Sequence, residues 1–139
     1  MKLFRILISA ALVIALMPFT ARAQEQKSPE QQEKEMREAI DKEVEKYIRT
    51  LDLDMAQEFY VDSILTHDYF AMREEIMEKS RAKVSNADLY VAIQDKWAER
   101  IYQSFRKVLD DDQWAKYLKG GAARDKKARD KREAKRTAQ

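Results

Sequence analysis

The chain of 139 residues has no cysteine, one histidine, two glycines and two prolines. The lack of cysteine excludes a disulfide-stapled scaffold, and the scarcity of glycine and proline excludes a turn-rich all-β sandwich and a glycine-rich nucleotide-binding fold. What remains is 45% hydrophobic and 37% charged residues, a mixture typical of amphipathic helices. The composition therefore predicts an all-α protein.

Groups that could carry catalysis are equally scarce. The single histidine, His67, has no cysteine or second histidine with which to share a metal, and the sequence contains no nucleophile, zinc or phosphate-binding motif. Acidic runs such as Glu74-Glu75 and residues 110–112 could attract divalent cations, but solvated helix faces and helix N-termini explain them more simply. We expect no enzyme, no cofactor and no metal, and interpret His67 as a partly exposed helix residue.

The first 23 residues are predicted to form a secretory signal that is cleaved. Lys2 and Arg5 precede an apolar run over residues 6–17, and Ala21-Arg22-Ala23 supplies the small–x–small pattern of a cleavage site. The apolar run is too short for a membrane span, which needs about 20 residues. We expect cleavage before Gln24 and a mature protein in an exported compartment such as a periplasm.

Four helix starts follow, each marked by a capping residue with a glutamine or an acidic residue three positions later. The capping residues are Ser28, Asp54, Ser85 and Asp110. Apolar stripes at helical spacing follow the first three starts, which predicts antiparallel hairpins built from three long amphipathic helices and a short fourth. The residues that we expect in the core include Phe59, Trp97, Ile101 and Phe105.

Charge is segregated along the chain. Residues 24–118 have a net charge of −7, whereas residues 119–139 carry nine basic and three acidic side chains. Gly120 and Gly121 separate these regions and are predicted to end the fourth helix or to form a hinge. The basic side chains beyond the glycines are Arg124, Lys126, Lys127, Arg129, Lys131, Arg132, Lys135 and Arg136.

The segment after the glycines contains no large apolar residue that could be buried. We therefore expect residues 24–119 to form the helical domain and residues 120–139 to be a mobile basic tail. Three roles for the tail stay open: a solubilising extension, long-range attraction to an anionic membrane surface or to acidic clients, and folding back onto the acidic body.

Two of the helix starts share the pattern L-D-x-x-Q. Leu53, Asp54 and Gln57 form the first copy, and Leu109, Asp110 and Gln113 form the second. The pair resembles the L-T-x-x-Q motifs of the Spy/CpxP family of periplasmic proteins, with aspartate in place of threonine, over residues 50–120. This resemblance implies an all-helical, cradle-shaped homodimer and, as in several family members, an ATP-independent chaperone.

The aromatic side chains also favour a binding role, because a short helical chain has limited interior in which to bury them. The candidate client-binding residues are Tyr60, Ile64, Tyr69, Phe70 and Tyr90. We expect a non-enzymatic protein of envelope stress response that holds exposed apolar segments of unfolded or partly folded proteins. Export argues against nucleic acid as a partner and leaves at most peripheral contact with an anionic membrane.

Two other functions remain open at this point. One is a periplasmic metal-responsive or signalling protein that uses its carboxylates. The other is a structural or partner-binding bundle whose aromatic side chains all lie inside.

Overall fold

A computed structural model describes residues 27–138, and all regular structure in this range is helical. The elements are α2 (Pro29–Leu51), α3 (Met55–Arg81), α4 (Ala87–Val108), α5 (Asp111–Tyr117), the π-helix η1 (Leu118–Ala122) and α6 (Ala123–Thr137). The predicted all-α fold is therefore confirmed. The predicted secretory signal, residues 1–23, lies outside the described residues.

Three of the four predicted helix starts are capping boxes, as expected. The side chains of Ser28, Asp54 and Asp110 each accept a hydrogen bond from the backbone N–H three residues later, where a glutamine side chain accepts from the N–H of the capping residue. Helix α4 differs, because Asn86 caps it in place of Ser85 and accepts from two N–H groups of the first turn. Serine and asparagine are caps of similar strength, so their order in the sequence does not rank them.

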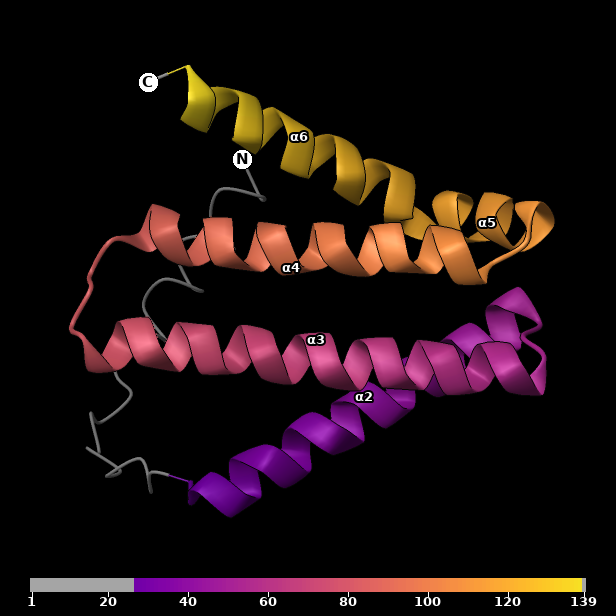
Figure 1. Ribbon diagram of the computed structural model, residues 1–139, viewed down its shortest axis with the longest axis horizontal. Helices are drawn as coiled ribbons and strands as arrows, with labels where there is room; N and C mark the ends of the chain where they lie inside the picture. Colours follow the sequence, from indigo (N-terminus) through magenta and orange to yellow (C-terminus); the bar gives the residue numbers. More distant parts are fainter. Residues whose placement is uncertain (1–26, 139) are drawn as a thin grey trace, which may run out of the picture.

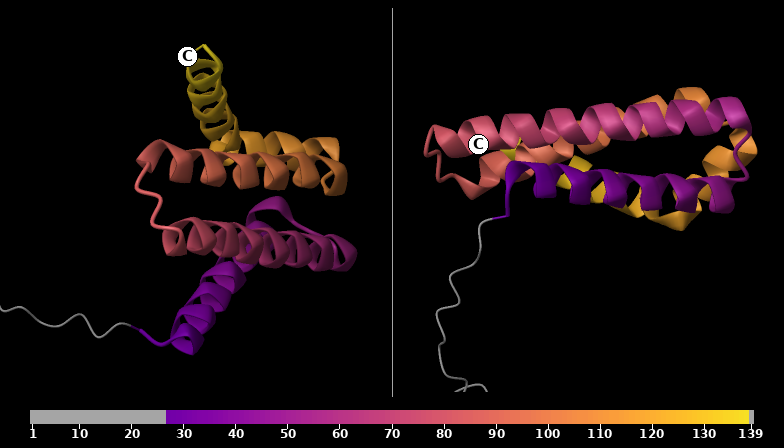
Figure 2. Two further views of the ribbon diagram at one scale, coloured as in Figure 1. Left: turned by 60° about the vertical axis from the view of Figure 1, so that its left-hand side comes forward. Right: turned by 90° about the horizontal axis from the view of Figure 1, so that it is seen from below.

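The central feature of the fold is an antiparallel hairpin of the two long helices α3 and α4 (Figure 1). Helix α2 crosses α3 on one side of this hairpin, and α6 runs along α4 on the other side (Figures 1 and 2). The connections α2–α3 and α4–α5 lie at the same end of the hairpin, so both L-D-x-x-Q motifs meet there.

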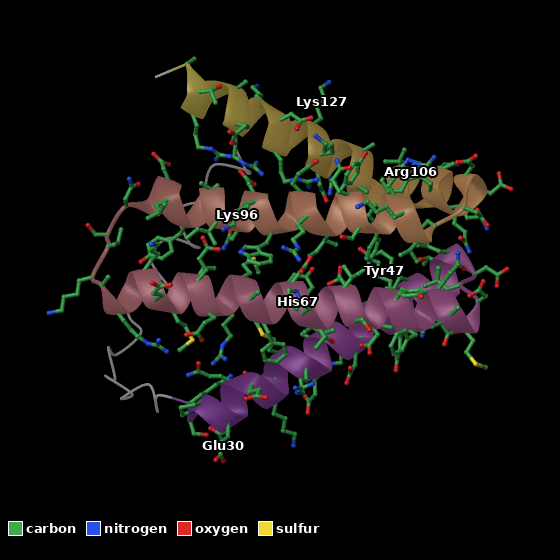
Figure 3. The ribbon with its side chains drawn as sticks, in the orientation of Figure 1. Glu30, Tyr47, His67, Lys96, Arg106 and Lys127 are labelled. Atoms are coloured by element: carbon green, nitrogen blue, oxygen red, sulfur yellow. The ribbon has the colours of Figure 1, made fainter. Side chains whose placement is uncertain are left out.

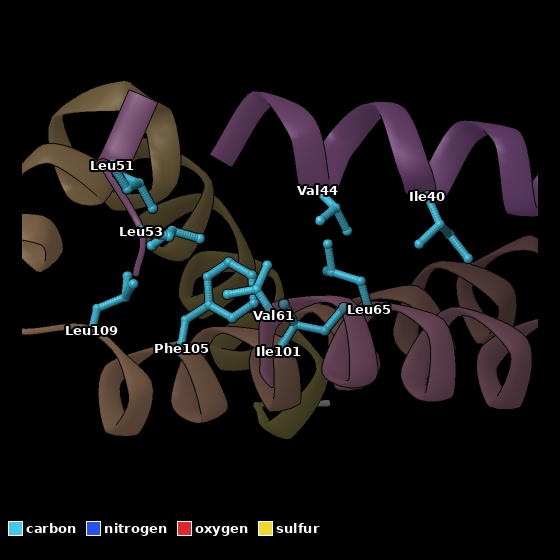
Figure 4. Packing of buried hydrophobic residues seen from close by; sticks show 9 residues of the cluster. All are labelled: Ile40, Val44, Leu51, Leu53, Val61, Leu65, Ile101, Phe105 and Leu109. Atoms are coloured by element: carbon cyan, nitrogen blue, oxygen red, sulfur yellow. The ribbon is translucent and has the colours of Figure 1, made fainter. Parts of the chain in front are cut away.

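The core lies between α2, α3 and α4 and extends to the motif end (Figure 4). Its buried residues are Ile40, Val44, Leu51, Leu53, Val61, Leu65, Ile101, Phe105 and Leu109. Phe105 and Val61 are fully shielded from solvent. The Phe105 ring meets the rings of Tyr47 and Tyr117, each with its centroid 5.2 Å away, and so joins α2, α4 and α5.

Two residues expected in the core lie elsewhere. Phe59 is 68% exposed, because it is two positions, or about 200° around the helix, from Val61, which faces the core. Trp97, in the middle of α4, is half-buried, and its indole Nε1 donates a hydrogen bond of 2.7 Å to Glu75. The neighbouring helices α2 and α4 cover only part of the apolar surface of α3.

The segment expected to be a mobile tail forms helix α6. The chain reaches it through η1, where Gly121 has φ of 126°, a conformation that side-chain-bearing residues rarely adopt. The chain reverses direction at the α4–α5 connection, and the hinge expected at the glycines is a kink between α5 and α6. None of the helices within residues 27–138 combines the length and the apolarity needed to cross a membrane.

Candidate functional site

The two L-D-x-x-Q motifs bind each other through their glutamines. Gln57 Nε2 donates to Gln113 Oε1 at 2.6 Å, and Gln113 Nε2 donates to Gln57 Oε1 at 2.9 Å. Each amide also donates to a backbone carbonyl of the opposite connection, Gln57 to Val108 at 3.1 Å and Gln113 to Asp52 at 3.2 Å. Each of these acceptors precedes an N-cap residue by two positions, so the two motifs make equivalent hydrogen bonds to each other.

Every donor and acceptor atom of the two side-chain amides makes hydrogen bonds in this junction. Each Oε1 also accepts a hydrogen bond of 3.0 Å from the N–H of its own cap, Asp54 or Asp110. The motif leucines, Leu53 and Leu109, are buried in the core beside the junction. We predicted the six motif residues as helix caps, whereas their arrangement shows a second role: they fasten α3 to α5 across the end of the hairpin.

The five candidate client-binding residues do not form one surface. Tyr60 is 55% exposed, whereas Ile64, Tyr69 and Phe70 are half-buried and pack against the core. Tyr90 lies at the opposite end of the hairpin, where its hydroxyl donates a hydrogen bond of 2.7 Å to the carbonyl of Val84. Among the candidates, only Tyr60 is largely open to solvent.

An exposed apolar patch does occur on the first turns of α3. It consists of Met55 (85% exposed), Phe59 (68%) and Tyr60 (55%), which we call the α3 patch. The rings of Phe59 and Tyr60 contact each other edge to face with centroids 5.8 Å apart. We did not predict Met55 or Phe59 as binding residues. Two exposed rings show that the aromatic side chains do not all lie in the interior.

A cavity of about 430 Å³ opens between α2, α3, α4 and the kink before α6. Four tyrosines line it: Tyr47, Tyr69, Tyr102 and Tyr117. Within the cavity, Glu43 accepts hydrogen bonds from the hydroxyls of Tyr47 at 3.1 Å and Tyr69 at 3.2 Å. Figure 3 shows Tyr47 at the junction of α2 with the hairpin.

Burial raises the pKa of three of the phenols in this cavity. It raises the pKa of Tyr117 to about 12, and burial together with the nearby Glu43 carboxylate raises the pKa of Tyr47 and of Tyr69 above the ordinary value for tyrosine. The three hydroxyls are therefore hydrogen-bond donors at neutral pH. The cavity can accommodate an apolar or aromatic group.

Helix α6 is fastened to α4 by ion pairs, which is the fold-back that we kept as one of three roles for the basic segment. Arg132 donates to both oxygens of the buried Asp95, at 2.6 and 2.9 Å, and Arg136 donates to the same carboxylate at 3.1 Å. The hydrogen bonds from Arg132 and then from Arg136 hold the pKa of Asp95 below its ordinary value.

A second set of pairs lies one turn nearer the kink. Arg129 Nη2 is 3.2 Å and Lys126 Nζ 3.5 Å from Glu99 Oε2. The guanidinium of Arg129 also lies over the Tyr102 ring, 5.5 Å from its centroid. Our expectation overlooked that arginine can pack its stem and guanidinium on an aromatic face, so α6 needs no large apolar residue to dock.

His67 occupies the exposed position that we expected. Its side chain is 65% exposed, and Nδ1 lies 2.7 Å from Oδ1 of Asp68, a buried carboxylate that also pairs with Arg100 Nε at 3.2 Å. This trio links α3 to α4 near the middle of the hairpin (Figure 3). In residues 27–138 no group of three or more histidine, aspartate or glutamate side chains is placed to hold a metal ion.

Comparison of the chain with protein-family models, curated proteins and solved structures gave no match.

Proposed function

We propose that this protein is a non-enzymatic binding protein that holds exposed apolar segments of unfolded or partly folded proteins without ATP. The observation that carries the proposal is the α3 patch. Three large hydrophobic side chains, Met55, Phe59 and Tyr60, are presented to solvent on two consecutive turns of a helix that is held firmly at its start by the paired motifs. An exposed cluster of this kind is typical of a binding surface.

The surroundings of the patch suit weak and reversible binding. Glu58 and Asp62 lie within the same two turns, so a client segment with basic residues would be attracted by charge and held by apolar contact. Methionine and two aromatic rings adapt to varied side chains, which favours breadth over tight selection. Release then needs no nucleotide, because each contact contributes little by itself.

The address, the assembly state and the family are part of the same proposal. The signal-like residues 1–23 would send the chain to the periplasm, where an envelope-stress chaperone meets unfolded clients. The paired L-D-x-x-Q motifs support a relationship to the Spy/CpxP family, in which the proteins form homodimers. A dimer would place two α3 patches in one particle and raise the avidity for long clients.

Suppression of aggregation tests the proposal. The processed chain, residues 24–139, is mixed with an aggregating unfolded client, and light scattering is followed with a several-fold excess of the chain. We expect the wild type to reduce scattering and the variant M55S/F59S/Y60S to lose most of this effect. The matched control is V91S, which removes an exposed hydrophobic side chain from α4.

The outcome depends on comparing these three proteins. Because all substituted side chains are exposed, circular dichroism is expected to show unchanged helix content in both variants. If the wild type fails to reduce scattering, the chaperone proposal is wrong. If the triple variant suppresses aggregation as well as V91S does, clients bind elsewhere and the α3 patch is not the site.

A further inference from the structure

The basic side chains of α6 divide into two sets by the face on which they lie. Lys126, Arg129, Arg132 and Arg136 face α4 and are paired with carboxylates. Three of these four are arginines, whose planar guanidinium suits hydrogen-bonded pairing with a fixed carboxylate. The basic residues on the face of α6 that contacts α4 therefore hold this helix on the hairpin.

The opposite face carries a second row of cations, Arg124, Lys127, Lys131 and Lys135, which we call the outer row. All four are exposed, and Arg124 is paired with its neighbour Asp125. No ion pair within the described chain involves the three lysines. Figure 3 shows Lys127 on the side of α6 that faces away from α4.

The outer row lies at one edge of a strongly polarised molecule. Helix α6 has eight basic and three acidic side chains, whereas residues 28–81, which contain α2 and α3, have 15 acidic and eight basic ones. Because α6 and α2 lie on opposite sides of the central hairpin, the positive and negative regions are well separated (Figures 1 and 2). An anionic surface would therefore draw the molecule in with α6 foremost.

We propose that the outer row is a docking surface for anionic phospholipid headgroups. The lysines at positions 127, 131 and 135 follow one face of a helix, so they can meet a flat layer of phosphates together. Lysine acts as a mobile point charge and suits phosphates that have no fixed arrangement. Ala128 and Ala134 are the apolar residues beside the row, so contact with the headgroups is electrostatic and does not involve insertion into the acyl layer.

A lipid surface fits these observations better than nucleic acid does. The outer row has no aromatic side chain on which a base could stack and no asparagine or glutamine that could read a base edge. A secretory signal at residues 1–23 would also place the chain beside a membrane and away from nucleic acid. The proposal goes beyond client holding, since the α3 patch and the outer row lie on different helices.

Vesicle co-sedimentation tests the proposal with the processed chain, residues 24–139. The wild type is mixed with vesicles of phosphatidylcholine that contain phosphatidylglycerol, and separately with vesicles of phosphatidylcholine alone. We expect binding to the anionic vesicles at low salt and its loss as the salt concentration rises, because headgroup attraction is screened. The variant K127Q/K131Q/K135Q is expected to bind these vesicles more weakly by on the order of 100-fold.

Two further variants test whether weaker binding is caused by loss of the outer row itself or by a change in net charge or folding. K34Q/K42Q/K107Q removes the same charge from exposed lysines of α2 and α4 and is expected to bind nearly as well as the wild type. K127R/K131R/K135R keeps the charge and should bind like the wild type. Both triple-glutamine variants should still suppress client aggregation, so a failure here is distinct from a failure of the proposed function.

Several results would overturn the docking surface. They are absence of wild-type binding to the anionic vesicles, equal binding to neutral vesicles, and equal weakening by the two triple-glutamine variants. A fourth is binding of a double-stranded DNA oligonucleotide as tight as that of the vesicles at the same salt concentration, which would show a general affinity for polyanions.

Discussion

Helices α2 and α6 flank the central hairpin on opposite sides but are held there by different forces. Helix α2 contributes Ile40, Val44 and Leu51 to the buried core. Helix α6 contains no buried residue and is fastened by Arg132 and Arg136 to the Asp95 carboxylate. One contact therefore depends on the removal of apolar surface from water, and the other on charge.

Because of this difference, we expect the two helices to respond differently to pH and to salt concentration. Burial of apolar side chains does not depend on pH and is not screened by added salt. Ion pairs whose basic partners are partly exposed contribute little net stability and weaken with salt. We infer that α2 is an integral part of the folded body, whereas α6 is a docked element that solution conditions can loosen while the rest of the fold persists.

The largest expected loss of stability comes from a substitution in the apolar contact between α2 and the hairpin. Ile40→Ala removes a side chain that is 3% exposed and leaves a cavity between α2 and α3. We expect a loss of about 2–5 kcal/mol in the free energy of unfolding, measured by urea denaturation. Lys34→Ala, an exposed change on the same helix, should have almost no effect. A loss no larger than that of the control would show that α2 is not held by its apolar face.

The starts of helices α2, α3 and α5 were the features most predictable from the sequence. Ser28, Asp54 and Asp110 cap their helices as expected, because a capping box is a local pattern that depends on residues three positions apart. The helical stripe also identified Ile101 and Phe105 as core residues. Local rules were insufficient for Phe59, since its burial depends on which neighbouring helix covers that face.

The contacts between distant residues were not predictable in the same way. The sequence shows the same motif twice, but the bond between Gln57 and Gln113 arises only when two connections meet at one end of a hairpin. Likewise, the composition of residues 120–139 indicated a mobile tail, because we counted only large apolar residues as docking groups. The Arg132–Asp95 pair shows that a charged helix can dock when the facing helix carries a buried carboxylate.

An intermediate loss of stability is expected from a substitution at the junction of the two L-D-x-x-Q motifs. Gln113→Glu keeps an oxygen that can accept from the Asp110 N–H but removes the amide donor to Gln57 and to the carbonyl of Asp52. Loss of a donor at a largely buried position should destabilise the fold by about 1–3 kcal/mol in urea denaturation at neutral pH.

The matched control for this substitution is Gln31→Glu. Gln31 also accepts from the N–H of its capping residue, Ser28, but its capping box is exposed and makes no link to a second motif. We expect a change within about 0.5 kcal/mol for this exposed position. Equal losses in the two variants would mean that the motifs act as caps alone and that the link between the glutamines adds no stability.

The smallest effect on global stability, and the most local one, is expected from the charged side of the comparison. Arg132 and Arg136 lower the pKa of Asp95 in the folded protein. The ion pairs therefore stabilise the folded protein fully at a pH above the ordinary aspartate pKa of about 3.9, and this stabilisation is lost as the pH falls through the lowered pKa. Acidification below about pH 4 should therefore loosen α6, and Asp95→Asn should do so at neutral pH. Hydrogen exchange resolved by segment is the measurement: amides of α6 should exchange faster in both cases, whereas those of α2 around Val44 keep their protection. If the amides of α2 and α6 lose protection together, the two helices belong to one cooperative unit, and the distinction between an apolar and a charged attachment fails.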